Sequence, residues 1–217
     1  MTFGIELEAE NGNSKVIRFL NKTLFNRWTI KSDPSLINNA LEINSPIIHY
    51  SQKDLQELYQ VCKFMKDNGL EATANCACHI HIGADFFKTK KEWLIFFYLF
   101  TACEEIIYLL SNAENSLPRK KSDYYAQYLT DEFLEAIEDG ILTIDDSESY
   151  NEFLERLKES VQPITFRNKA VNILNVNTQN KNTIEFRMPN GTLDFNVIHQ
   201  NLKLLDRKST RLNSSHV

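Results

Sequence analysis

A short alternation near the start of the chain places two carboxylates on one side of a β-strand. Residues 3–8 read Phe-Gly-Ile-Glu-Leu-Glu, with an apolar side chain at every second position. Because successive side chains of a strand point to opposite faces, Glu6 and Glu8 share the face that lacks the apolar residues. Two such carboxylates repel each other unless water solvates them or a cation lies between them. The segment therefore indicates either a solvated strand face or one side of a metal site.

The same arrangement recurs in three later segments, residues 41–46, 71–83 and 183–189. Opposite their apolar faces these segments carry Glu42, His79, His81, Glu185 and Arg187. If the four strands pair in one antiparallel sheet, all of these side chains and the first two glutamates line a single surface. Paired strands at 171–177 and 183–189 are expected to form a closing hairpin.

The third segment also suggests zinc, because Cys76, Cys78, His79 and His81 follow one another closely. Alternation argues against that interpretation, since it places the two cysteines on one face and the two histidines on the other. We therefore expect the cysteines in the core and the histidines on the acidic face. Carboxylates with one or two imidazoles favour Mg²⁺ or Mn²⁺ over zinc.

Helical periodicity accounts for most of the remaining apolar residues. A capped helix is predicted over 51–68, followed by Gly69. A single long helix is predicted over 89–112; its apolar residues run almost all round, so it should lie centrally in the core. Glu104 and Glu105 are expected to mark the side of that helix nearest to water or to a site.

Other helices are expected at 14–24, as one pair within 123–160, and from Asp194 through Leu205. A short strand is expected at 28–30, followed by a turn over 31–35 by composition. Residues 207–217 show no periodicity and are interpreted as a non-native tail, which would leave the domain short at its C-terminus.

Composition narrows the class of protein. The 217 residues suggest one large domain, or two at most, and the net charge of −5 argues against a nucleic-acid partner. The longest apolar run, residues 93–103, is too short to cross a membrane, and an apolar leader is interrupted by Glu6 and Glu8. Four cysteines without secretory context predict reduced thiols and a cytoplasmic location. No glycine-rich phosphate loop occurs, so a nucleotide would be held through metals.

The motifs together resemble the amidoligase family, relatives of glutamine synthetase and glutamate–cysteine ligase among the carboxylate–amine ligases. The resemblance rests on residues 3–8, 33–35, 42–46, 79–83, 167–173 and 183–194. It implies an α+β fold, with a curved antiparallel β-sheet and helices packed on one face, as in the catalytic domain of glutamine synthetase. It also implies one catalytic domain over 1–206 with a helical insertion at about 113–160.

The resemblance further implies an ATP-dependent ligase that joins a small-molecule or peptide carboxylate to an amine through an acyl phosphate. By likeness to glutamine synthetase, Glu6, His79 and Glu185 would hold the nucleotide-side Mg²⁺ or Mn²⁺. Glu8 and Glu42 would hold the substrate-side metal. Arg187 would stabilise the transferred phosphoryl group, with Glu8 and Glu185 also in catalytic positions. His81, Arg167 and Arg119 are further candidates for contacts with the nucleotide or substrate.

Three alternative interpretations remain open at this point. A metal-dependent guanidine kinase on the same fold would transfer phosphate without making an amide. A non-catalytic relative would bind nucleotide or metal without turnover. A purely structural protein would leave the repeated clustering of acids and imidazoles on one side of the strands unexplained.

Overall fold

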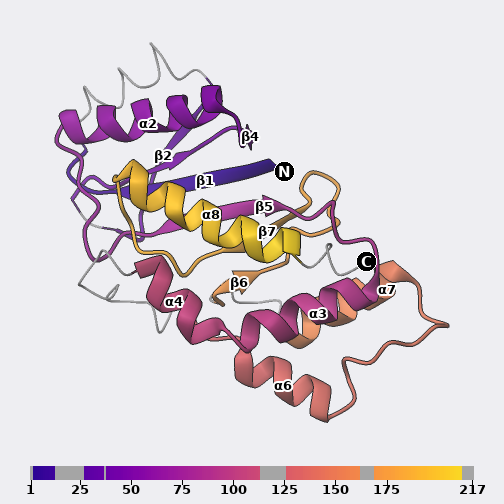
Figure 1. Ribbon diagram of the computed structural model, residues 1–217. Helices are drawn as coiled ribbons and strands as arrows, with labels where there is room; N and C mark the ends of the chain where they lie inside the picture. The colour runs from indigo at the N-terminus through magenta and orange to yellow at the C-terminus, as the bar shows by residue number, and fades with distance from the viewer. Residues whose placement is uncertain (1, 13–26, 37, 113–125, 162–168, 212–217) are drawn as a thin grey trace.

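The computed structural model describes residues 2–12, 27–36, 38–112, 126–161 and 169–211. Within these residues the fold is α+β, as predicted, with seven strands in one open antiparallel sheet and six helices (Figure 1). The strands are β1 (Thr2–Ala9), β2 (Thr29–Ser32), β3 (Leu41–Asn44), β4 (Ile48–His49), β5 (Cys78–Gly83), β6 (Val171–Asn172) and β7 (Thr183–Phe186). The helices are α2 (Gln52–Asp67), α3 (Lys90–Thr101), α4 (Glu104–Asn112), α6 (Thr130–Glu138), α7 (Tyr150–Val161) and α8 (Phe195–Arg211).

The first strand organises the sheet, whose order is β2-β3-β1-β5-β7-β6, with β4 also pairing with β1. In this register Glu6 lies opposite Asn44 on one side and His79 on the other. On the next pair of strands, His81 lies opposite Glu185. Because a slip of one residue would turn the apolar side chains outward, burial of one face fixes this register. The four ligand-bearing segments therefore share one face of one sheet, as predicted.

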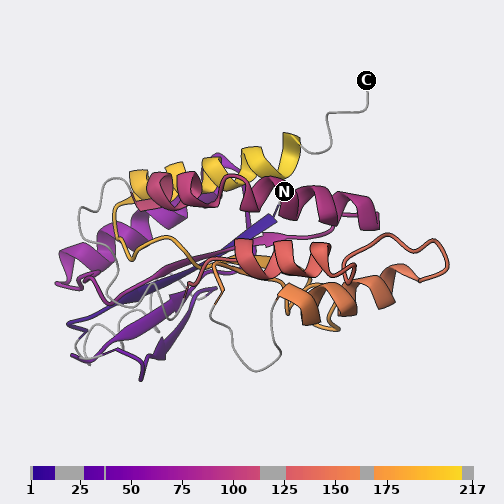
Figure 2. The same cartoon turned by 90° about the horizontal axis from the view of Figure 1, so that it is seen from below.

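The opposite face of the sheet carries the core. Ile5, Leu7 and Ile80 on this face are at most 1% exposed. A layer formed by α2, α8, α4 and α3 covers the sheet on one side (Figure 2). The two remaining helices, α6 and α7, pack against α3. Cys76 and Cys78 are buried with this core, and burial raises the pKa of both thiols, so their assignment as core residues holds.

Helix ends follow the predicted signals. The Ser51 hydroxyl accepts from the Asp54 N–H at 3.2 Å to begin α2, and Gly69 follows it with a φ of 79°. Asp194 accepts from the Asn196 N–H at 2.8 Å, and α8 continues past the predicted Leu205 to Arg211. The helix predicted at 14–24 lies outside the described residues.

The prediction of one long helix over 89–112 is wrong. The chain forms two helices, α3 and α4, that are bent by 66° at Ala102 and Cys103. Glu104 was expected to face water or a site, but it is 1% exposed and turns inward to the first turn of α6. Its carboxylate accepts from the N–H groups of Leu129 and Thr130 at 2.9–3.0 Å. Glu105 is exposed, as predicted.

Several strand predictions were too long, and the strand predicted over 183–189 ends at Phe186. The segment predicted over 71–83 becomes regular strand only from Cys78, and the one predicted over 171–177 pairs only at Val171 and Asn172.

Among the described residues, no single helix has the length and apolarity to cross a membrane. The bent pair formed by α3 and α4 reaches those limits only when the two are counted together.

Candidate functional site

Three side chains from adjacent strands converge on the polar face of the sheet. Ligand atoms of Glu6 on β1, His79 on β5 and Glu185 on β7 all lie within 4.8 Å of one another. His79 Nδ1 is 3.2 Å from Glu6 Oε2 and 3.5 Å from Glu185 Oε1. The structure thus brings together the three residues that the resemblance assigned to the nucleotide-side metal.

The second nitrogen of the same imidazole is buried but has no hydrogen-bond partner within the described part of the chain. His79 is 6% exposed, and its Nε2 lies 4.0 Å from Glu8 Oε1, beyond hydrogen-bond distance. The other oxygen of Glu8 accepts from the Ala77 N–H at 2.6 Å. A buried imidazole nitrogen without a partner, close to several carboxylates, suits a cation as its missing partner.

The charges of the site keep its acids ionised. Burial raises the pKa of Glu6, but hydrogen bonds and charge from His79 and His81 outweigh burial and hold that pKa well below its usual value. Burial also raises the pKa of Glu185, and the charges of Arg187 and the two histidines reverse that shift and lower it. Both carboxylates are therefore in the form that binds metals.

Glu185 is further held by two neighbours. The Arg187 guanidinium donates to Glu185 Oε1, and Asn172 Nδ2 donates to Glu185 Oε2 at 2.7 Å. Asn172 lies opposite Glu185 in the β6–β7 register, which explains why it reaches this oxygen. These bonds orient the carboxylate and place Arg187 beside the three-residue cluster.

Glu42 lies farther along the same face and has different partners. It is opposite Glu8 in the β1–β3 register, and it accepts from Asn44 Nδ2 at 2.6 Å. Lys31 Nζ lies 3.5 Å from Glu42 Oε1. The predicted pair of Glu8 and Glu42 is thus adjacent in the sheet, with the second acid turned toward a lysine.

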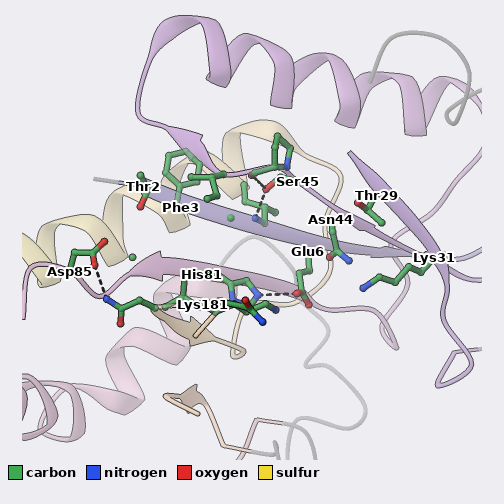
Figure 3. A pocket seen from close by; sticks show the side chains of 18 residues that line it. Thr2, Phe3, Glu6, Thr29, Lys31, Asn44, Ser45, His81, Asp85 and Lys181 are labelled. Atoms are coloured by element: carbon green, nitrogen blue, oxygen red, sulfur yellow. Dashed lines mark hydrogen bonds and ion pairs between the residues drawn. The ribbon is translucent and has the colours of Figure 1, made fainter. Parts of the chain in front are cut away.

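All seven side chains predicted for the polar face line one cleft of about 370 Å³. A second cavity of about 530 Å³ adjoins it and shares Glu6, Lys31, His81 and Lys181 with it (Figure 3). His81 Nε2 lies 3.0 Å from Glu6 Oε1 at this junction. Together the two cavities form a groove along the polar face.

Sequence reasoning missed both lysines of the groove. Lys31 was assigned to a turn, but β2 extends to Ser32, so Lys31 shares a face with Thr29. Continuing the alternation by two residues would have found it. Lys181 lies in the connection before β7, where no periodic signal marks it. Arg119 and Arg167, two further predicted contacts, lie outside the described residues.

A family model described as "Putative amidoligase enzyme" matches residues 1–208, which include every strand of the sheet and both cavities. A search of curated proteins found no match.

Proposed function

This chain belongs to that amidoligase family, whose description is that of a ligase, and we propose that it is an ATP-dependent carboxylate–amine ligase. In the proposed reaction a substrate carboxylate oxygen attacks the γ-phosphorus of ATP, giving an acyl phosphate and ADP. An amine nitrogen then attacks the acyl carbon and loses a proton as phosphate leaves. We infer the same sheet arrangement as in the glutamine synthetase catalytic domain. The cluster of Glu6, His79 and Glu185 is the single observation on which the proposal rests.

The donor set of this cluster fits a divalent cation. Two ionised carboxylates and an imidazole suit Mg²⁺ or, with the histidine better tolerated, Mn²⁺. The buried His79 Nε2, which has no hydrogen-bond partner among the described residues and lies 4.0 Å from Glu8 Oε1, favours a further cation on the Glu8 side of the imidazole. Glu8 and Glu42 would contribute to a second, substrate-side metal. When bound, such metals would neutralise charge on phosphate oxygens.

Arg187 has the position and chemistry to assist phosphoryl transfer. Its side chain lines the cleft and is 13% exposed, beside the buried Glu185 carboxylate that orients the guanidinium. A planar guanidinium binds two oxygens of a phosphoryl group at once, which a lysine does not. Arg187 would therefore stabilise the charge that develops on the transferred group.

The larger cavity has room for the nucleotide next to this cluster. Its wall includes the exposed Ile47, which offers apolar surface, and His81, which borders both cavities. Asn44 Oδ1 and Thr183 Oγ1 are buried in this wall without hydrogen-bond partners among the described residues. Buried polar atoms of this kind favour a polar ligand that supplies the missing bonds.

The proposal is tested by ADP release from the full chain with Mg²⁺ or Mn²⁺ and a panel of carboxylates and amines. Mass spectrometry then looks for a product equal to both substrates minus water. Glu185→Gln should abolish ADP release because it removes a metal ligand and the partner of Arg187. Glu135→Gln, an exposed glutamate on α6, is the matched control and should leave it unchanged.

Other outcomes would overturn the proposal in different ways. ADP release with guanidine compounds alone, with a phosphorylated guanidine as product, would identify a guanidine kinase. ATP and Mg²⁺ binding by calorimetry without turnover on any substrate pair would identify a non-catalytic relative. Unchanged turnover in Glu185→Gln would exclude this cluster as the catalytic centre.

A further inference from the structure

Gly4 lies in the interior of a regular strand, where glycine is an unfavourable residue. It pairs with His81 in an unbroken β1–β5 register, so no bulge on this side of β1 requires it. Its φ is not positive, unlike that of Gly69 and Gly140. A glycine within a strand weakens the strand, and it often marks a bulge or a site where another backbone or a ligand approaches closely. The surroundings of Gly4 decide between these causes.

The space above Gly4 has room for a side chain. Among the described residues, a Cβ added here would meet only His81 Cβ at 3.7 Å and Ser45 Oγ at 3.8 Å, which are ordinary van der Waals distances. At the other glycines without a positive φ, an added Cβ would lie 2.5–2.8 Å from another atom; these are Gly12, Gly83 and Gly191. The fold thus explains every glycine of the chain except Gly4, and close approach of another backbone is not its cause.

The outer side of Gly4 forms part of the floor of the larger cavity. Gly4 and Glu6 share the polar face of β1 and are two residues apart, which is about 7 Å along a strand. Bare backbone therefore adjoins the three-residue cluster that contains Glu6, with His81 and Ser45 on either side of β1 (Figure 3). We call this space the Gly4 slot.

The walls of the Gly4 slot favour an uncharged group with polar edges. The N–H and C=O groups of a strand point toward neighbouring strands within the sheet, so the slot offers carbon, and no hydrogen-bond donor for a phosphate, at its floor. The exposed Ile47 adds apolar surface. Asn44 Oδ1 and Thr183 Oγ1 are buried in the same cavity wall and have no hydrogen-bond partners among the described residues. A nucleoside has this chemistry, with flat apolar faces and with hydroxyl and amino groups at its edges.

We propose that the nucleoside part of ATP rests on the backbone at Gly4 and that the missing side chain is what admits it. This role depends on the proposed function, because the nucleotide is that of the proposed ligase reaction. With metal-bound phosphates at Glu6, the sugar and base follow the polar face of β1 over Gly4. A methyl group at this position would lift the nucleoside from its contacts, which weaken steeply with distance.

Calorimetric titration of the full chain with Mg²⁺ and the non-hydrolysable ATP analogue AMP-PNP tests the proposal. Gly4→Ala should raise the dissociation constant for the analogue at least about tenfold, because a methyl group forced into a close contact is as unfavourable as overpacking a core. Its melting temperature should not fall, because the fold has room for the methyl group and alanine is the better residue within a strand. Its affinity for Mn²⁺ without nucleotide should equal that of the wild type.

Gly140→Ala is the matched control, since it adds the same methyl group to a glycine that lines neither cavity. Because Gly140 has a φ of 69°, this variant should lower the melting temperature and leave the dissociation constant for the analogue unchanged. The two variants separate a glycine that the backbone requires from one that a ligand requires.

The possible results distinguish this role of Gly4 from the proposed function. An unchanged dissociation constant in Gly4→Ala, or a melting temperature that falls as far as in Gly140→Ala, would overturn the role of Gly4 and leave the proposed ligase standing. A raised KM for the carboxylate or the amine, with unchanged binding of the analogue, would assign the Gly4 slot to that substrate instead. Binding of the analogue that depends on Gly4, without turnover of any substrate pair, would overturn the ligase alone. A wild type that binds no analogue would overturn both.

Discussion

Replacing Glu6 by glutamine tests the proposed metal site separately from the proposed catalysis. The change removes one negative ligand from the cluster of Glu6, His79 and Glu185 while keeping the size of the side chain. The Glu6 side chain is 25% exposed, so the amide that replaces the carboxylate can be solvated. The folded state should therefore survive while the affinity for a divalent cation falls.

The expected stabilisation of the folded state by the ion follows from the linkage between binding and unfolding. An ion at 100 times its dissociation constant stabilises the folded state by about 2.7 kcal/mol, which raises the melting temperature of a domain this size by about 5–11 °C. Mutating residues that hydrogen-bond to metal ligands typically weakens metal binding about 10–100-fold. Losing a charged ligand itself should raise the dissociation constant by at least this factor. The stabilisation at the same ion concentration then drops to about 0.4–1.4 kcal/mol, or about 1–6 °C.

The assay is thermal unfolding of the wild type, Glu6→Gln and Glu135→Gln during a titration with MnCl₂. Wild type and the Glu135 variant should show the same large shift, because Glu135 is an exposed residue of α6 outside the cleft. Glu6→Gln should show the reduced shift. An equal shift in all three proteins would refute the assignment of Glu6 as a ligand, and no shift in the wild type would refute the metal site.

Three further predictions concern the fold that supports the site. Glu104→Ala should lower the free energy of unfolding, measured in urea, by about 2–4 kcal/mol, because it leaves the N–H groups of Leu129 and Thr130 without an acceptor. The control Glu135→Ala should change that free energy by less than about 0.5 kcal/mol, and similar values for the two variants would contradict the capping role of Glu104. Gly191→Ala should cost about 1–3 kcal/mol in the same measurement, because the added Cβ would lie 2.5 Å from Cys76 Cβ and 2.7 Å from its carbonyl carbon; a neutral effect would show that this contact relaxes freely. Without metal, the free energy of unfolding should decrease as the pH is lowered below 4.5, the ordinary pKa of Glu, because the unfolded chain binds a proton that folded Glu6, with its lowered pKa, does not bind. Glu6→Gln should flatten this pH dependence, and an unchanged slope in that variant would contradict the lowered pKa of Glu6.

The faces of the strands could be predicted from the sequence because they depend on local periodicity alone. Alternation places Glu6 and Glu8 opposite Ile5 and Leu7 whichever strands pair with them, and the structure has the same arrangement. The same rule separated Cys78 from the two histidines on β5. The family was predicted from the same motifs and is confirmed by the match over residues 1–208.

Features that depend on distant partners could not be predicted in this way. The bend between α3 and α4 has no proline or glycine to mark it, and the inward turn of Glu104 depends on Leu129 and Thr130 of another helix. Lys31 was missed because strand ends are weakly encoded, and β2 runs two residues beyond the predicted limit at Ile30.

The wide separation of the clustered ligands along the chain has a consequence for how the protein matures. Glu6 is synthesised long before Glu185, and the strand that carries His79 must pair with both β1 and β7 before the three meet. Contacts so remote in sequence form late in folding, because closing long loops is slow. If the proposed metal site is real, a nascent polypeptide on the ribosome should be unable to bind the ion until β7 has emerged, so ion uptake would report completed assembly of the sheet.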